Sequence, residues 1–296
     1  MSAADEHHAT RRAAGLFDFS FMGLYEFENL ASIQGVQTRN VEKLERGQIA
    51  YTLVLKEDGA VLIDATVWRL DAERFWLFTG KRSAHGGRDR SGELAILALQ
   101  GPASGRILAR LIGKDAVFSL RYFHFATQGA MTVARLGYSG ELGYELLVPP
   151  AEADRWRQKL LKEGTSEGLR ECGWSAADSL RIESGYVLFD REIDGRANPR
   201  ELGLERFVSE RRDFGVRRRL VGLEIAGAPA PAALPAARVT SECFSPLLEK
   251  RIALGFAPPQ SLQPGSELRL EDGRLARATL LPFYDAERRR PRADPL

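Results

Sequence analysis

The sequence predicts a protein of the α+β class with more than one domain. The chain has 296 residues, a length typical of two or three domains, and its 44% hydrophobic content is sufficient for a sizeable core. Most of the chain reads as short strands, with helices interspersed among them. A segment of almost only Ala, Pro and Gly, residues 226–237, reads as a linker. The short strands that follow it predict a small all-β domain.

A meander of three strands is the first large element that the pattern predicts. Residues 47–55 are rich in strand formers, the pair Asp58-Gly59 favours a hairpin turn, and residues 60–70 and 74–80 follow as further strands. Since side chains alternate along a strand, the middle strand has two faces. The predicted core face consists of Val61, Ile63, Ala65 and Val67. The opposite face consists of Leu62, Asp64, Thr66 and Trp68.

Asp64 is a lone carboxylate inside this apolar run. A charged group there costs free energy unless it finds a partner, is neutralised, or serves the function. The pattern alone leaves two interpretations open, a functional carboxylate and a satisfied carboxylate on a turn or edge strand.

The remaining elements follow in order along the chain. They are a buried strand and a helix within residues 93–113, a strand–turn–strand unit at 131–150, helices at 151–164 and from 176, and strands at 251–257 and 267–284.

Charge and composition argue against several classes of protein. The formal net charge is only +2, and the basic runs 211–219 and 287–292 fit a solvated loop and a tail better than a nucleic-acid site, because no nucleic-acid-reading module surrounds them. The two cysteines and four histidines lack metal-ligand spacing, so no metal site is predicted. His7 and His8 are expected to be only a polar N-terminal segment.

The chain is expected to be cytoplasmic and not bound to a membrane. No apolar stretch approaches the roughly 20 residues that span a bilayer. The first residues, MSAADEHHATRRAAG, also lack the apolar core of a signal peptide.

Several stretches, in order, resemble the aminomethyltransferase family, which comprises the T-protein of the glycine cleavage system and its folate-using relatives. They extend from about residue 6 to 284. They are AAGLFDFSFMG, AYTLVLKEDGAVLIDATVWRL, LALQGPAS, LGYSGELGYEL, AADSLRIESGYVLFDREID, NPRELGL, TSECFSPLLEKRIALGFA and LPFY.

The resemblance implies a cloverleaf of three domains around a central folate channel. A split α+β folate-binding domain is expected at residues 1–23 and 92–195, with a ferredoxin-like domain inserted at 24–91. A connecting segment with the Ala/Pro linker is expected at 196–237, before a C-terminal β-barrel with a basic tail at 238–296.

The resemblance also implies a function. It is transfer of a methylene group from an aminomethyl-lipoyl carrier protein to tetrahydrofolate, with release of ammonia. Tetrahydrofolate is the expected cofactor, the lipoylated carrier protein of the glycine cleavage system is the expected partner, and the chain is expected to be a monomer. Asp64 matches the second Asp of a GGxxDD motif, beside the reactive nitrogens of the folate. It is the expected catalytic residue, since a carboxylate stabilises developing positive charge and can orient or accept a proton.

Four residues match the cofactor-binding positions of the family. Glu145 matches a glutamate that grips the pterin ring, where a carboxylate suits paired N–H donors. Tyr51 and Tyr138 match tyrosines that line the channel, and packing in the core is the alternative for both. Arg181 matches a further arginine, and its alternative is a salt bridge to Asp178 or Glu183.

The chain also departs from the family pattern. Ala177 replaces an arginine that contacts the glutamate tail of folate, Phe21 replaces a histidine, and Ile63 replaces the first Asp of the motif. The chain begins where the family is already under way, and the loop after residue 80 is shortened. Three other functions therefore stay open. The first is a folate-binding protein of the iron–sulfur maintenance type, without transferase activity. The second is a folate-dependent demethylase, and the third is a degenerate paralogue.

Overall fold

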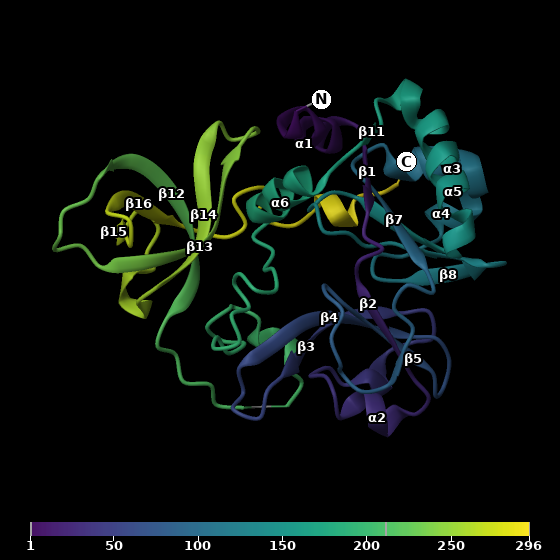
Figure 1. The fold of residues 1–296 in the computed structure, drawn as a ribbon, viewed down its shortest axis with the longest axis horizontal. Coiled ribbons are helices and arrows are strands. Elements are labelled where there is room, and N and C mark those ends of the chain that lie inside the picture. Colours follow the sequence, from purple (N-terminus) through teal and green to yellow (C-terminus); the bar gives the residue numbers. More distant parts are fainter. Residues whose placement is uncertain (1, 211, 296) are drawn as a thin grey trace.

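The computed structural model describes residues 2–210 and 212–295, which form three sheets with helices around them. Figure 1 shows three lobes, each built on one sheet, with helix α6 (Trp174–Glu183) near the centre. The predicted α+β class with several domains is confirmed.

The first lobe contains a six-stranded sheet in the order β11-β1-β7-β10-β9-β8. Strand β11 is parallel to β1, and the other pairs are antiparallel. The strands are β1 (Gly15–Asp18), β7 (Ala95–Gln100), β8 (Phe125–Gln128), β9 (Met131–Ala134), β10 (Gly143–Val148) and β11 (Arg170–Glu171). Helices α3 (Ser104–Ile112), α4 (Lys114–Phe118) and α5 (Pro150–Gly164) cover one face, where side chains of the strands and helices share one hydrophobic cluster.

Helix α1 (Ala3–Arg12) packs on α6 at the other face of this sheet. Ser2 and Asp5 form a capping box that fixes the start of α1. The prediction that His7 is only part of a polar N-terminal segment is wrong. Its side chain is buried against α6, and its Nδ1 lies 2.7 Å from Ser179 Oγ, because α1 turns this position inward.

The second lobe contains a five-stranded antiparallel sheet in the order β3-β4-β5-β2-β6. The strands are β2 (Gly23–Phe27), β3 (Ile49–Leu55), β4 (Val61–Arg69), β5 (Phe75–Thr79) and β6 (Arg88–Asp89), with the short helix α2 (Leu30–Gln34) after β2. The predicted meander is confirmed as β3, β4 and β5, and its predicted core face is buried. On the opposite face Trp68 is also buried, because it lies between Phe78 of this sheet and Phe125 of the first sheet, with ring centroids 4.8 and 5.0 Å away.

The third lobe is a closed barrel in the order β12-β14-β13-β15-β16. Its strands are β12 (Arg219–Pro229), β13 (Ala236–Ser245), β14 (Lys250–Ala257), β15 (Glu267–Leu270) and β16 (Arg274–Thr279). The barrel therefore begins at Arg219 and not at residue 238 as predicted. The segment 226–237 is divided between the end of β12, a turn and the start of β13. The first residues of β12, RLVGLEI, carry an apolar strand pattern that the sequence analysis did not assign to the barrel. The Ala- and Gly-rich end of β12 carries no such pattern and is nevertheless extended.

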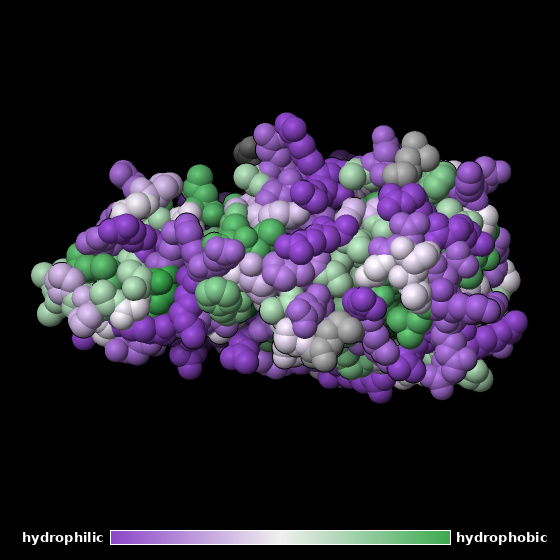
Figure 2. All heavy atoms as spheres, turned by 90° about the horizontal axis from the view of Figure 1, so that it is seen from above, coloured by the Kyte–Doolittle hydropathy of each residue, from purple (hydrophilic) through white to green (hydrophobic). Residues whose placement is uncertain are grey.

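Five short 3-10 helices complete the described structure: Val41–Lys43, Thr165–Glu167, Glu205–Phe207, Pro259–Ser261 and Arg290–Arg292. Beyond the barrel the chain returns to the first lobe, where Arg135 Nη2 donates to the carbonyl oxygen of Ala293 at 2.6 Å. Hydrophilic side chains cover most of the face in Figure 2, and hydrophobic ones interrupt them in small groups. Among the residues described, no helix is long and apolar enough to cross a membrane.

Candidate active site

Helix α6 carries a buried arginine that joins two lobes. Arg181 Nε donates to Asp178 Oδ1 at 2.8 Å, and its Nη1 donates to Glu192 Oε2 at 2.7 Å and to the carbonyl oxygen of Tyr186 at 3.1 Å. Its Nη2 donates to Ser241 Oγ of the barrel strand β13 at 2.6 Å. The side chain has no exposed surface. We therefore infer that Arg181 positions its neighbours and acts on a ligand only through them.

Glu192, in the loop after α6, is the second half of this arrangement. Its Oε2 also accepts from the backbone N–H of Leu188 at 2.9 Å, and its Oε1 accepts from the hydroxyls of Thr240 and Ser241, both at 2.6 Å. These bonds fasten the loop to the barrel. Sequence reasoning missed Glu192, because an acid inside the run DREID looks like a solvated loop residue.

Asp64 lies on β4 beside Tyr51 of β3. The Tyr51 hydroxyl donates to Asp64 Oδ2 at 3.0 Å, and burial raises the pKa of Tyr51 well above its usual value, so the phenol keeps its proton. Burial raises the pKa of Asp64 to about 6, although the Tyr51 hydrogen bond opposes this. The charge of Glu192 raises the Asp64 pKa and that of Arg181 lowers it, which places Asp64 close to the buried ion pair.

Tyr138 extends the same group of side chains. Its hydroxyl donates to the carbonyl oxygen of Val187 at 2.6 Å, and its ring stacks on Tyr186 with centroids 5.8 Å apart. Burial raises the pKa of Tyr138, and the charges of Arg181 and Asp64 also act on it. The predicted residues Asp64, Tyr51, Tyr138 and Arg181 thus come together around the C-terminal end of α6.

Glu145 lies on the first sheet, apart from these four residues. Its neighbours on β10 pack under α3 and α5, so alternation turns Glu145 toward the opposite face, on the side of α6. The register places one row of side chains across the sheet, in the order Phe17, Ala98, Glu145, Ala134 and Phe125. Both alanines are fully buried in the hydrophobic cluster on this face of the sheet. Burial alone raises the pKa of Glu145 to about 7, and the side chain has no hydrogen-bond or ion-pair partner among the residues described.

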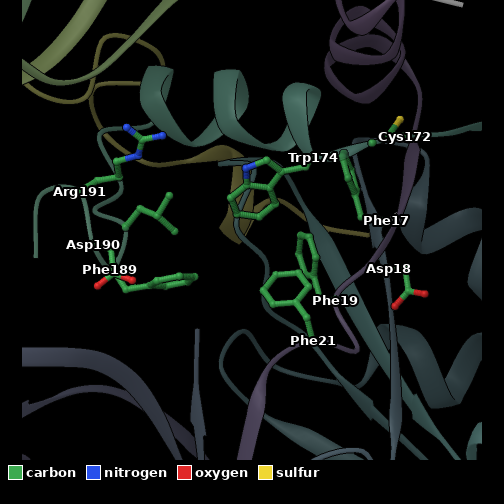
Figure 3. A pocket seen from close by; sticks show the side chains of 11 residues that line it. Phe17, Asp18, Phe19, Phe21, Cys172, Trp174, Phe189, Asp190 and Arg191 are labelled. Atoms are coloured by element: carbon green, nitrogen blue, oxygen red, sulfur yellow. The ribbon is translucent and has the colours of Figure 1, made fainter. Parts of the chain in front are cut away.

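A cavity of about 470 Å³ opens beside this row. It is lined by Phe17, Asp18, Phe19, Phe21, Cys172, Gly173, Trp174, Leu188, Phe189, Asp190 and Arg191. Figure 3 shows Phe19, Phe21 and Trp174 on one side and Phe189 and Arg191 on the other. Successive centroids from Phe17 through Phe19 and Phe21 to Trp174 lie 5.8 to 5.9 Å apart, so a chain of aromatic rings leads from the sheet to the surface.

Sequence reasoning identified the polar groups of this site but not its aromatic wall. The alternation of Phe17, Phe19 and Phe21 in FDFSF was the available signal, since alternate residues of an extended segment share a face. Tyr51 both donates a hydrogen bond to Asp64 and packs in the core, because the centroid of its ring lies 4.8 Å from that of Phe207. Arg181 forms the salt bridge to Asp178 that the sequence analysis gave as one alternative. It forms none to Glu183, which instead lies 2.8 Å from Arg11.

The fold and the site together define a class of protein. It is a three-lobed α+β protein with an aromatic-walled cavity and, outside the lining of that cavity, two carboxyl groups of raised pKa, Asp64 and Glu145. Aromatic cavities and carboxyl groups of raised pKa are typical of sites that bind ligands and transfer protons.

Comparisons with known proteins identify the family. The model of the GCVT N-terminal domain matches residues 1–212, and that of the Glycine cleavage T-protein C-terminal barrel domain matches residues 218–285. The aminomethyltransferase of Symbiobacterium thermophilum is 34% identical over 98% of this chain and 91% of its own length. That of Desulfitobacterium hafniense is 34% identical over 95% and 89%.

A solved structure agrees with these matches. The crystal structure of glycine cleavage system aminomethyltransferase T from Bartonella henselae is 27% identical, covers 96% of this chain and 90% of its own, and superposes with a TM-score of 0.84. The chain belongs to the aminomethyltransferase family of glycine cleavage T-proteins.

Proposed function

We propose that this protein is a folate-dependent aminomethyltransferase. It moves a methylene group from an aminomethyl-lipoyl carrier protein to tetrahydrofolate and releases ammonia. The observation that carries the proposal is Asp64, a half-buried carboxyl with a pKa of about 6 that is held by the Tyr51 hydroxyl beside the Arg181–Glu192 pair. Relatives named aminomethyltransferase that cover nearly the whole chain support the same activity.

The residues present fit tetrahydrofolate as a ligand. Glu145 is a buried carboxyl without a protein partner, which is costly unless a ligand supplies hydrogen-bond donors. The 2-amino group and ring N–H of a pterin are two such donors on one edge. The aromatic wall from Phe17 to Trp174 suits the flat rings of the molecule.

When bound, tetrahydrofolate supplies N5 and N10, the nitrogens that accept the methylene carbon. In the overall reaction the carbon–sulfur and carbon–nitrogen bonds of the donor break and bonds from carbon to N5 and N10 form. The two hydrogens displaced from N5 and N10 leave on ammonia and on the dihydrolipoyl thiol.

Asp64 serves this reaction in two ways. As a carboxylate above pH 6 it stabilises the positive charge that develops as the amine leaves, and it can accept a proton from a folate nitrogen. Tyr51 keeps Asp64 oriented through its hydrogen bond, and the Arg181–Glu192 pair holds the surrounding loop in place. Glu145 orients the pterin ring.

Two measurements test the function, anaerobic calorimetric titration with tetrahydrofolate and a coupled glycine-cleavage assay with a lipoylated carrier protein. We expect binding and turnover. Binding without turnover would favour a folate-binding protein without transferase activity or a demethylase, and absence of binding would favour a degenerate paralogue. We further propose that the protein acts as a monomer in the cytoplasm.

A further inference from the structure

Residues 286–295, here called the strap, follow the barrel and lie beyond the match to the family's barrel domain, which covers residues 218–285. Figure 1 shows the strap in yellow, where it runs past α6 to the first lobe. Its 3-10 helix, Arg290–Arg292, follows two residues of positive φ, Asp285 at 54° and Arg288 at 53°. Non-glycine residues keep such a backbone only where their surroundings hold it, so the strap has a fixed path.

A buried arginine of the first lobe anchors the outer end of the strap. Arg135, directly after β9, donates from Nη2 to the carbonyl oxygen of Ala293 at 2.6 Å and from Nη1 to that of Leu120 at 3.0 Å. No carboxylate of the described residues forms an ion pair with Arg135, so these carbonyl groups are what its buried charge depends on. Arg292 of the strap also lies over the ring of Tyr122, 5.6 Å from its centroid.

Gly105, in helix α3, leaves room for the last described residue of the strap. Pro295 is buried, and a Cβ at position 105 would lie 2.7 Å from both its Cβ and its carbonyl oxygen. Glycine weakens a helix relative to alanine, so α3 loses some helix stability at the place where the strap packs. The outer end of the strap thus has a fitted place on the first lobe.

The inner end of the strap lies beside the tyrosines of the candidate active site. The guanidinium of Arg288 is 5.4 Å from the ring centroid of Tyr186, and the Tyr186 ring stacks on Tyr138. Burial raises the pKa of Tyr51 and the charge of Arg288 acts against this, which places the guanidinium near Tyr51. Tyr51 in turn donates to Asp64 at 3.0 Å.

Arg288 differs from its neighbour in the strap. It is half-buried, and it forms no ion pair with any residue that the structure describes, whereas Arg289 is exposed and pairs with Glu287. The contact that Arg288 makes is therefore the one with the face of Tyr186.

We propose that the strap holds the tyrosine side of the candidate active site in its binding position, and that Arg288 is the positioning residue through which it does so. The proposal rests on the proposed function and adds to it a segment outside the family match. A cation is attracted to the face of an aromatic ring, so Arg288 restrains Tyr186 and, through stacking, Tyr138. Because the outer end of the strap is anchored, the two rings are ordered before a ligand binds, which lowers the entropic cost of binding.

Anaerobic calorimetric titration of full-length variants with tetrahydrofolate tests the inference. Arg288→Gln should weaken binding about threefold to tenfold, the cost of ordering one or two side chains at the moment of binding. Arg288→Lys keeps a cation over the ring and should retain part of the affinity. Arg289→Gln, at the exposed neighbour, is the matched control and should leave the affinity unchanged.

A second variant displaces the strap from its other end. Gly105→Ala favours helix α3 but puts a methyl group where Pro295 packs. It should weaken tetrahydrofolate binding as Arg288→Gln does, and the double variant should lose no more, because both changes act through the strap. Trypsin, which cuts after arginine, should also cleave the strap faster in Gly105→Ala than in the wild type.

Gly215→Ala is the control for the glycine substitution, since a Cβ there would meet nothing within 4 Å. The inference is overturned if Arg288→Gln binds tetrahydrofolate as tightly as the wild type or more tightly. Additive losses in the double variant, or equal cleavage of the strap in Gly105→Ala and the wild type, would also overturn it. These outcomes leave the proposed function intact, whereas absence of binding to the wild type would overturn both.

Discussion

Asp64, which is half-buried, and Glu145, which is buried, are both acids of raised pKa, but their surroundings differ. Asp64 keeps a hydrogen bond from Tyr51 and lies near Arg181, whereas Glu145 has only alanines beside it in its sheet row. The difference fits two roles. Asp64 titrates near pH 6 and can exchange a proton, while Glu145 has its hydrogen-bonding capacity left for a ligand.

Asp64→Asn should lower kcat by a factor of about 10² to 10⁴, the range for a general acid–base group, and leave most tetrahydrofolate binding intact. Asparagine keeps the size and an acceptor for Tyr51 but cannot take a proton. The pH profile of kcat/KM should rise with an apparent pKa near 6 in the wild type, and this limb should vanish in the variant. Asp58→Asn, in the exposed turn of the same hairpin, is the control. Unchanged turnover in Asp64→Asn would remove this residue from the mechanism.

Glu145→Gln should make the unliganded protein more stable at alkaline pH. A carboxyl with a raised pKa binds its proton more tightly in the folded chain, so the free energy of unfolding falls as pH rises from about 4.5 to about 7. The variant should avoid this fall and be more stable at pH 8 by about 3 kcal/mol, at 1.36 kcal/mol per pKa unit. Urea unfolding at pH 5 and pH 8 measures the difference, and Glu57→Gln, at an exposed turn, should show none.

The same change should weaken tetrahydrofolate binding. Loss of charged hydrogen bonds to the pterin costs on the order of 2 kcal/mol, measured by calorimetry. Gain of stability together with loss of affinity is expected of a residue kept for binding. If affinity did not change, the pterin would lie elsewhere.

At the scale of elements, α6 and the loop after it join the lobes. The helix starts at the cavity with Trp174 and ends near Asp64, and the loop supplies Leu188, Arg191 and Glu192. Arg181 and Glu192 form a fully buried ion pair that reaches β13 through Ser241. Such a pair stabilises the fold little compared with apolar packing. Removal of one partner, however, is strongly destabilising, because it leaves the other charge buried and unpaired.

Arg181→Met should lower the free energy of unfolding by about 3–5 kcal/mol, because Glu192 loses its cation and stays buried. Adding Glu192→Gln to this variant should recover part of the lost free energy of unfolding, since no unpaired carboxylate then stays buried. Denaturant unfolding of the two variants and the wild type measures this. A double variant less stable than Arg181→Met would show that the hydrogen bonds of Glu192, and not its charge, matter most.

At the scale of the whole molecule, a buried network ties α1 to α6 and to the chain beyond the barrel. Arg11 Nη1 lies 3.0 Å from Glu141 Oε1 and its Nη2 lies 2.8 Å from Glu183 Oε2, while Tyr284 OH donates to Glu141 at 2.8 Å. Burial raises the pKa of Glu141 despite Arg11. Burial also acts to raise the pKa of Glu183, but His7 and Arg11 outweigh it and hold that pKa below its usual value.

Arg11→Met should destabilise the protein by about 3–5 kcal/mol at pH 7, because two buried carboxylates lose one guanidinium. The deficit should shrink toward pH 4, where protonation neutralises the carboxyl groups. Thermal unfolding across this range measures it. Arg12→Met changes the exposed neighbour on the same helix and should alter stability by no more than about 0.5 kcal/mol. Equal effects of the two changes would argue against a specific network.

The sequence by itself determined the features that depend on local alternation. The period of two on β4 places Asp64 opposite the core face, and the strand–turn–strand pattern at 131–150 contains β9 and β10, with Glu145 on β10. Family motifs then assigned these acids a role. Local patterns suffice here because a strand turns alternate side chains to opposite faces whatever it packs against.

Only the tertiary structure decided which residues face one another. His7 meets Ser179 from 172 positions away, and Arg181 meets Ser241 from 60 positions away, contacts that no local pattern encodes. The Ala- and Gly-rich end of β12 likewise pairs with β16 although it has no strand signal of its own. The place of Arg191 in the cavity lining follows from the same cause, because burial of Glu192 against the barrel holds the loop there. Alternation determines the face on which a side chain lies, and packing between distant segments determines what it contacts.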